Sequence, residues 1–136
     1  MKKQFVLIAG LAMAIVTLSS FMVEVLPSTP ASPVFTWSEV EFDFGNIQMG
    51  TPVSHEFMFT NTGKTPLVIS NVQTPCGCTV TEFSKDAVAP GAQGYVKATY
   101  NAAKVGKFNK VITVNANTDD GIVKLTIAGE VIEPYN

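Results

Sequence analysis

The sequence holds two cysteines, Cys76 and Cys78, with only Gly77 between them. Side chains two positions apart on an extended segment point to the same side, so the two sulfurs can meet. Their Cα atoms would lie near the limit of about 7 Å for a disulfide unless the chain bends, and Gly77 permits that bend. A bridge that closes so small a ring is expected to be reduced more readily than an ordinary structural disulfide.

Three uses of this cysteine pair are open. The first is a local staple, or two packed thiols, that shapes a turn at a strand end, as is usual for cysteines in small exported domains. The second is a redox dithiol that exchanges with other proteins, although no Lys, Arg or His stands nearby in sequence to stabilise a thiolate. The third is a Cu(I) site, because two thiolates suit that ion. His55 and Met49 or Met58 would complete such a site only if the fold gathers them.

His55 is the one histidine of the chain, and it lies on the apolar side of an alternating segment. We therefore expect a half-buried, hydrogen-bonded side chain near a strand end rather than a ligand or a base. A Ser-His-Asp triad would need this residue, and no G-x-S-x-G motif accompanies it. Asp119 and Asp120 stand in a predicted turn and make a poor Ca²⁺ site without further oxygen ligands. The sequence predicts that the protein is not an enzyme and has no metal or other cofactor.

The composition bounds the class of protein. The 136 residues carry a formal net charge of −2, and all nine basic residues are lysine. Surfaces that bind phosphate rely on arginine forks and a positive field, so the composition argues against nucleic acid as a partner. With 46% hydrophobic and 15% charged residues, the chain fits one globular domain of about 100 residues plus an export segment.

Residues 1–26 predict an export signal. Met1-Lys2-Lys3 is a short positive start, and the apolar run 5–18 has the length of a signal peptide rather than of a membrane span. If it stays uncleaved, this segment is the one predicted contact with a membrane. Residues 27–36, rich in Pro, Ser and Thr, then form a linker, and residues 37–136 form the folded domain. We expect an exported protein, periplasmic or extracellular.

From about residue 35 onward, apolar and polar residues alternate, which is typical of strands buried on one face. Val53, His55, Phe57 and Phe59 share one side of the clearest run. These runs predict an all-β, Ig-like antiparallel sandwich of about seven strands. The predicted strand segments are 39–45, 53–59, 67–72, 94–100, 108–116 and 122–131.

Glycines mark the expected turns between these runs. Gly45 is expected to end the first strand by allowing a turn. Residues 61–63, Asn-Thr-Gly, are expected to form a tight connection, because Asn and Gly tolerate positive φ. Both blocks therefore indicate the fold rather than a functional site.

Five blocks of the chain follow one known pattern in one order: Phe42–Ile47, Phe57–Gly63, Pro66–Ile69, Cys76–Thr79 and Ala89–Gly91. Together they resemble a bacterial family of exported, Ig-like domains of unknown function with a C-G-C-T signature. That family is in turn similar to the ASH-type and major-sperm-protein-type modules, which are non-enzymatic interaction domains. The resemblance covers about residues 40 to 132, and it implies the fold and the location rather than an activity.

The sequence thus predicts an exported, non-catalytic module that binds another protein. The expected partner is an unidentified envelope or extracellular protein, bound by pairing of an exposed sheet edge with a partner strand. The alternative is a thiol-dependent function, either disulfide exchange or Cu(I) carriage, through Cys76 and Cys78.

Overall fold

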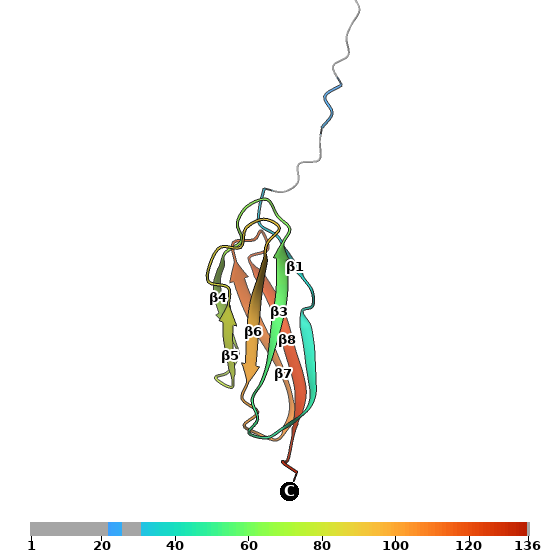
Figure 1. Ribbon diagram of the computed structural model, residues 1–136, viewed down its shortest axis with the longest axis vertical. Coiled ribbons are helices and arrows are strands. Elements are labelled where there is room, and N and C mark those ends of the chain that lie inside the picture. Colours follow the sequence, from blue (N-terminus) through green and yellow to red (C-terminus); the bar gives the residue numbers. More distant parts are fainter. Residues whose placement is uncertain (1–21, 26–30, 136) are drawn as a thin grey trace, which may run out of the picture.

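The computed structural model describes residues 22–25 and 31–135, and it shows eight β-strands (Figure 1). Within these residues no helix is long and apolar enough to cross a membrane. Most of the predicted signal, residues 1–21 and 26, lies outside the described residues, as do residues 27–30 of the predicted linker. The strands are β1 (Phe35–Trp37), β2 (Glu41–Gln48), β3 (Val53–Asn61), β4 (Ile69–Gln73), β5 (Thr79–Phe83), β6 (Gln93–Tyr100), β7 (Gly106–Ala116) and β8 (Ile122–Ile132).

The strands form two four-stranded sheets that pack face to face. Sheet A has the order β1-β3-β6-β5, and sheet B has the order β2-β8-β7-β4. Figure 1 shows the strands running along the long axis of the sandwich, with the described N-terminal segment and the C-terminus at opposite ends. The predicted all-β, Ig-like sandwich is confirmed.

The first strand of the sandwich is divided between the two sheets. β1 pairs antiparallel with β3 in sheet A, and after residues 38–40 the chain continues as β2, which pairs parallel with β8 in sheet B. The sandwich was predicted to be antiparallel, and the β2–β8 pair is its one parallel pair among the described strands. The structure has eight strands where about seven were expected, and β1 and β5 are the two that lie outside the six predicted segments. β1 also takes in residues 35 and 36, which the sequence analysis placed in the linker, because three residues are too few to show an alternating pattern.

Gly45 lies inside β2 and does not end it, contrary to the sequence-based expectation. Its φ is +66°, and the register with β8 shifts between Asp43 and Asn46, which marks a β-bulge. The Gly45 N–H donates to Asp43 Oδ1 at 2.8 Å. The conformational freedom of Gly45 is used as expected, but it inserts one extra residue into a continuous strand instead of ending the strand.

Sequence alternation missed β5 because its inward positions are weakly apolar. Thr79, Thr81 and Phe83 stand opposite Tyr100, Ala98 and Val96, the inward residues of β6. With two threonines on the buried side, the alternation of apolar and polar residues is too weak to distinguish this strand from a polar loop. The strand is held by its pairing with β6 rather than by its own hydrophobic face.

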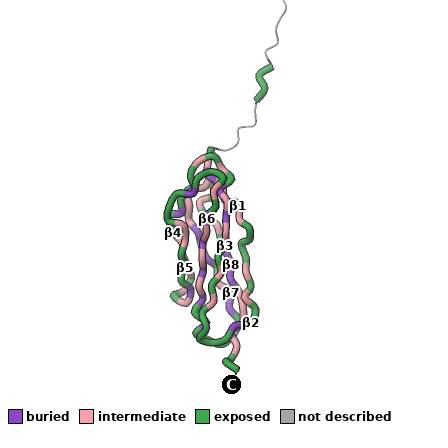
Figure 2. The backbone as a smooth tube through the Cα atoms, viewed as in Figure 1, coloured by how far each residue is buried: buried purple, intermediate pink, exposed green. Residues whose placement is uncertain are grey.

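The core lies between the sheets and draws on both (Figure 2). Tyr100 stacks on Phe108 with the ring centroids 3.9 Å apart. Gly129 makes room for this pair, since a Cβ there would come within 2.8 Å of the Phe108 ring. The largest fully buried apolar side chains are Phe57, Phe59, Leu67, Ile112, Leu125, Ile127, Val96, Val114 and Val131.

One buried polar side chain, that of Asn61, joins four segments of the chain. Its Oδ1 accepts the N–H groups of Val34 (3.2 Å) and Gly63 (3.1 Å). Its Nδ2 donates to the carbonyls of Thr65 (2.8 Å) and Val88 (2.9 Å). Asn61 is 0% exposed, and these four bonds use the full capacity of a side-chain amide. Asn61 therefore ends β3 and fixes the chain before β1, the loop after β3 and the segment before β6.

Gly63 permits this convergence through its small size. A Cβ at this position would lie 2.7 Å from Pro33 Cα and 2.7 Å from Val34 N, which no side chain tolerates. The Asn-Thr-Gly block was predicted to form a tight connection because Asn and Gly tolerate positive φ. In the structure, only Ala102 among the described non-glycine residues has positive φ, and Gly63 serves a close backbone contact.

We expect Asn61→Ala to lower the free energy of unfolding by about 3–5 kcal/mol, because it leaves four main-chain groups without their buried partner. Asn117→Ala is the matched control. Asn117 also braces main chain, through Val68 N–H (2.8 Å) and Pro66 C=O (3.1 Å), but on the surface, so its loss should cost about 1 kcal/mol. Urea unfolding followed by the fluorescence of the single Trp37 measures both, and equal losses would contradict the special role of Asn61.

Candidate functional site

Cys76 and Cys78 lie in the turn that carries the chain from β4 in sheet B to β5 in sheet A. Their Cα atoms are 5.3 Å apart and their sulfurs form a disulfide. Both residues are partly exposed, but Cys78 packs against the hydrophobic core while Cys76 does not belong to that cluster. The two sulfurs of the bridge therefore have different surroundings.

Hydrogen bonds hold the main chain of this turn on both sides of the bridge. Thr74 Oγ1 lies within hydrogen-bonding distance of the Cys76 carbonyl (3.1 Å) and the Thr79 carbonyl (3.3 Å). The N–H of Asn101, just after β6, donates to the Cys78 carbonyl at 3.0 Å. The turn is thus fixed by contacts that do not involve sulfur.

A buried hydroxyl stands beside one of the sulfurs. Thr79 is 4% exposed, and its Oγ1 lies 4.0 Å from Cys78 Sγ, within range of a weak hydrogen bond to sulfur. This is the one side-chain hydrogen bond of the Thr79 hydroxyl among the described residues. The hydroxyl can therefore direct its proton toward the sulfur of Cys78.

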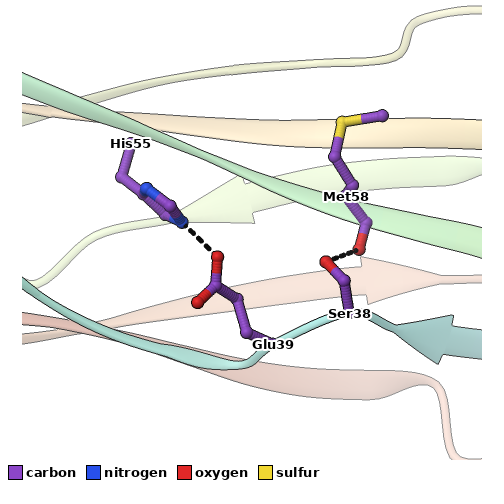
Figure 3. Close-up of polar contacts among 4 residues, drawn as sticks. All are labelled: Ser38, Glu39, His55 and Met58. Atoms are coloured by element: carbon purple, nitrogen blue, oxygen red, sulfur yellow. Dashed lines mark hydrogen bonds and ion pairs between the residues drawn. The ribbon is translucent and has the colours of Figure 1, made fainter.

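The fold does not gather the residues that a Cu(I) site was expected to use. His55 lies on β3, and β6 separates that strand from β5 and the cysteines. Met58 is three residues from His55 on the same strand and points away from it (Figure 3). Met49 is exposed in the turn between β2 and β3. Within residues 22–25 and 31–135, no group of three or more His, Cys, Asp or Glu side chains is placed to hold a metal.

His55 closes one side of the sandwich. Its ring stacks on Phe42 with centroids 3.6 Å apart and planes at 6°, which joins β3 of sheet A to β2 of sheet B. Its Nε2 lies 2.7 Å from Glu39 Oε1, and the side chain is 17% exposed (Figure 3). The expectation of a half-buried, hydrogen-bonded histidine is confirmed. Phe44 and Phe57 approach the same ring edge-on, so the cluster serves packing.

The outer edge of β5 carries free main-chain groups. Asn101 N–H donates to Cys78 C=O, and Ser84 N–H donates to Tyr95 C=O at 3.1 Å, so residues 78, 80, 82 and 84 face β6 in this register. Thr81 and Phe83 therefore turn their N–H and C=O groups away from the sheet. Within the described residues no hydrogen bond reaches those outward groups.

A pocket of about 530 Å³ adjoins the C-terminal end of β5. Its wall includes the apolar side chains of Phe83, Val88 and Tyr95, and Lys85 places its ammonium 4.0 Å from the centre of the Phe83 ring. An exposed sheet edge was expected to bind a partner, but β5 was not among the strands predicted from the sequence. No local signal in the sequence marks this edge, because Thr79 and Thr81 fill two of the three inward positions of β5.

We expect His55→Ala to lower the free energy of unfolding by about 2–4 kcal/mol, because it removes the ring that packs on Phe42 between the sheets. Glu39→Ala removes only the hydrogen bond to His55 from a half-exposed carboxylate and should cost less than about 1 kcal/mol. Thermal unfolding of both variants checks this difference. If Glu39→Ala proves the more costly, the ion pair rather than the stacking holds this side of the sandwich.

We expect the double variant Cys76→Ser, Cys78→Ser to fold and to lose about 1–3 kcal/mol of stability, because the bridge closes a very small loop. Urea unfolding of the oxidised protein and the variant gives the difference. A variant that fails to fold would show that the bridge is required for the structure.

The chain is similar to several solved structures and matches one family model. Among solved structures, a protein of unknown function from Porphyromonas gingivalis W83 matches with a TM-score of 0.66 and 16% identity, over 79% of this chain. This chain spans about half (51%) of that protein. The ASH/PapD-like domain 7 of human CEP192 matches with a TM-score of 0.66 and 11% identity, over 86% of this chain and 97% of that one.

The Vibrio cholerae protease VesB also matches, with a TM-score of 0.60 and 15% identity, over 71% of this chain but 32% of the protease. At such identities these likenesses establish the fold alone. No curated protein matches the sequence. The model of a family described as a protein of unknown function, DUF1573, matches residues 35–131, which run from the first residue of β1 nearly to the end of β8. This chain belongs to the DUF1573 family.

Proposed function

We propose that this domain is a non-catalytic interaction module that acts in the cell envelope or outside the cell. It binds an extended segment of another protein, which adds as a further strand to sheet A. The observation that carries the proposal is the outer edge of β5, where Thr81 and Phe83 present unpaired main-chain groups. Strand addition uses such groups for affinity and nearby pockets for specificity.

β5 suits strand addition better than the other three edge strands do. β1 has only three residues. β2 carries a bulge and the acidic side chains of Glu41 and Asp43, features that protect an edge from pairing. β4 has an irregular register between Ile69 and Asn71. β5 pairs with β6 in an unbroken register over all five of its residues.

The surroundings of β5 supply contacts for the side chains of a bound strand. Val80 is 62% exposed on the outer face of sheet A. The pocket beside Phe83 can take one side chain at the far end of the strand. Because alternate residues of an added strand point to opposite faces, one set would meet Val80 and the other would continue the buried face of the sandwich.

Three observations support a non-catalytic role outside the cytoplasm. The domain matches an ASH/PapD-like domain over 97% of that domain, whereas it matches only 32% of the protease VesB. The N-terminal sequence has the pattern of an export signal. The Cys76–Cys78 disulfide fits an oxidising compartment.

We expect Thr81→Pro to weaken capture of the partner at least about tenfold while leaving the domain folded. Proline removes the outward N–H of Thr81, which bonds nothing in the free domain, and an edge strand tolerates it there. Glu82→Pro is the matched control, because Glu82 donates its N–H toward β6 and its loss should destabilise β5 itself.

Site-specific photo-crosslinking of the full chain in cells measures this capture. A crosslinker at Val80 should join a partner, and one at Lys124 on sheet B should not. Capture at Lys124 in place of Val80, or full capture by folded Thr81→Pro, would overturn binding at β5. Failure to capture any protein at either position would overturn the interaction role.

A further inference from the structure

We propose that the Cys76–Cys78 bridge is a thiol–disulfide exchange site, at which Cys76 is the sulfur that an incoming thiol attacks. The co-reactant is a low-molecular-weight thiol or the dithiol of another protein. This inference is independent of the proposed binding at β5, since it rests on the turn between β4 and β5 and not on the edge of the sheet.

The fold does not depend on the bridge for most of its stability. A disulfide stabilises a protein mainly by closing a long loop in the unfolded chain, and this one encloses a single residue. The turn is held in any case by Thr74 Oγ1 on one side and by Asn101 N–H on the other. The bridge can therefore open without loss of the structure around it, which is what a reversible site requires.

The two sulfurs differ in how closely their residues pack against the core. Cys78 packs against the core, whereas Cys76 lies outside it and is partly exposed. Exchange needs the attacking thiolate, the attacked sulfur and the leaving sulfur in line, and the rate depends on access to the attacked sulfur. Both residues are partly exposed, and Cys76 is the one outside the core cluster, so attack there makes Cys78 the leaving group.

The Thr79 hydroxyl lies beside the sulfur that leaves when Cys76 is attacked. This group is buried, lies 4.0 Å from Cys78 Sγ, and has no other side-chain partner in the described part of the chain. When the bridge breaks, Cys78 takes the electron pair and becomes a thiolate. A hydroxyl within reach of that sulfur can donate a hydrogen bond to the thiolate, which favours Cys78 as the leaving group.

The exchange balances as two steps. A thiolate attacks Cys76 Sγ, a bond forms between those two sulfurs, and the Cys76–Cys78 bond breaks to release the Cys78 thiolate, which takes up a proton. A second thiolate then attacks the external sulfur of the mixed disulfide and releases Cys76. Two thiols become one disulfide, and the bridge gains two electrons and two protons. In reverse, Cys78 attacks a mixed disulfide at Cys76 and closes the bridge again.

The test uses the full folded chain with glutathione as the probe, quenched by acid and alkylation and mapped by peptide mass spectrometry. We expect millimolar reduced glutathione to open the bridge without denaturant. With oxidised glutathione, Cys78→Ser should accumulate a mixed disulfide on Cys76 at least about tenfold faster than Cys76→Ser does on Cys78. A bridge that opens only in denaturant, or equal rates in the two variants, would overturn the proposal.

Thr79→Val tests the role of the hydroxyl while keeping the shape of the side chain. We expect it to slow the opening of the bridge by glutathione about fivefold to tenfold, in line with the loss of one hydrogen bond to a charged sulfur. Thr81→Val is the control, because Thr81 also faces inward on β5 but lies further from the cysteines. Equal rates in the two valine variants would overturn the assignment of Thr79 as a positioning residue. Circular dichroism confirms that each variant is folded before its rate is compared.

Discussion

The fold depends most on the side-chain amide of Asn61, which is buried at the end of β3 and makes four hydrogen bonds. Those bonds reach three stretches of chain that the sheets themselves do not align: the residues before β1, the loop after β3 and the segment before β6. A buried amide is favourable only when all of its groups are paired, so each stretch has one acceptable position. The end of the sandwich from which β1 departs is set by this one side chain.

The two sheets are joined along their sides by the chain itself, and aromatic contacts add to this connection on one side. On one side the chain crosses between the sheets at residues 38–40, and His55 packs on Phe42 across the same boundary. On the other side the chain crosses through the Cys76–Cys78 turn. Aromatic stacking reinforces the crossing at residues 38–40, and the hydrogen bonds of Thr74 and Asn101 hold the crossing at the cysteines.

The parts of the fold that were predictable are those with local causes. β3 follows from the alternation of Val53, His55 and Phe57, and the disulfide was one of the outcomes allowed by the spacing of Cys76 and Cys78. β5 was not predictable because threonines fill its inward positions, and its edge is defined by pairing with a distant strand. Asn61 was interpreted as a turn residue because its partners at residues 34 and 88 are remote in sequence. The separation of His55 from Met58 could have been foreseen, since residues three apart on a strand face opposite ways.

The arrangement of the chain ends separates two regions of the molecule along its long axis. The residues that lead into β1 arrive at one end, and the turn with the disulfide lies toward the other, near the loop that begins at Asn101 (Figure 1). The length of the sandwich thus stands between residues 31–34 and the sulfur atoms. A large molecule that reaches the bridge approaches the pole of the domain that lies away from residues 31–34.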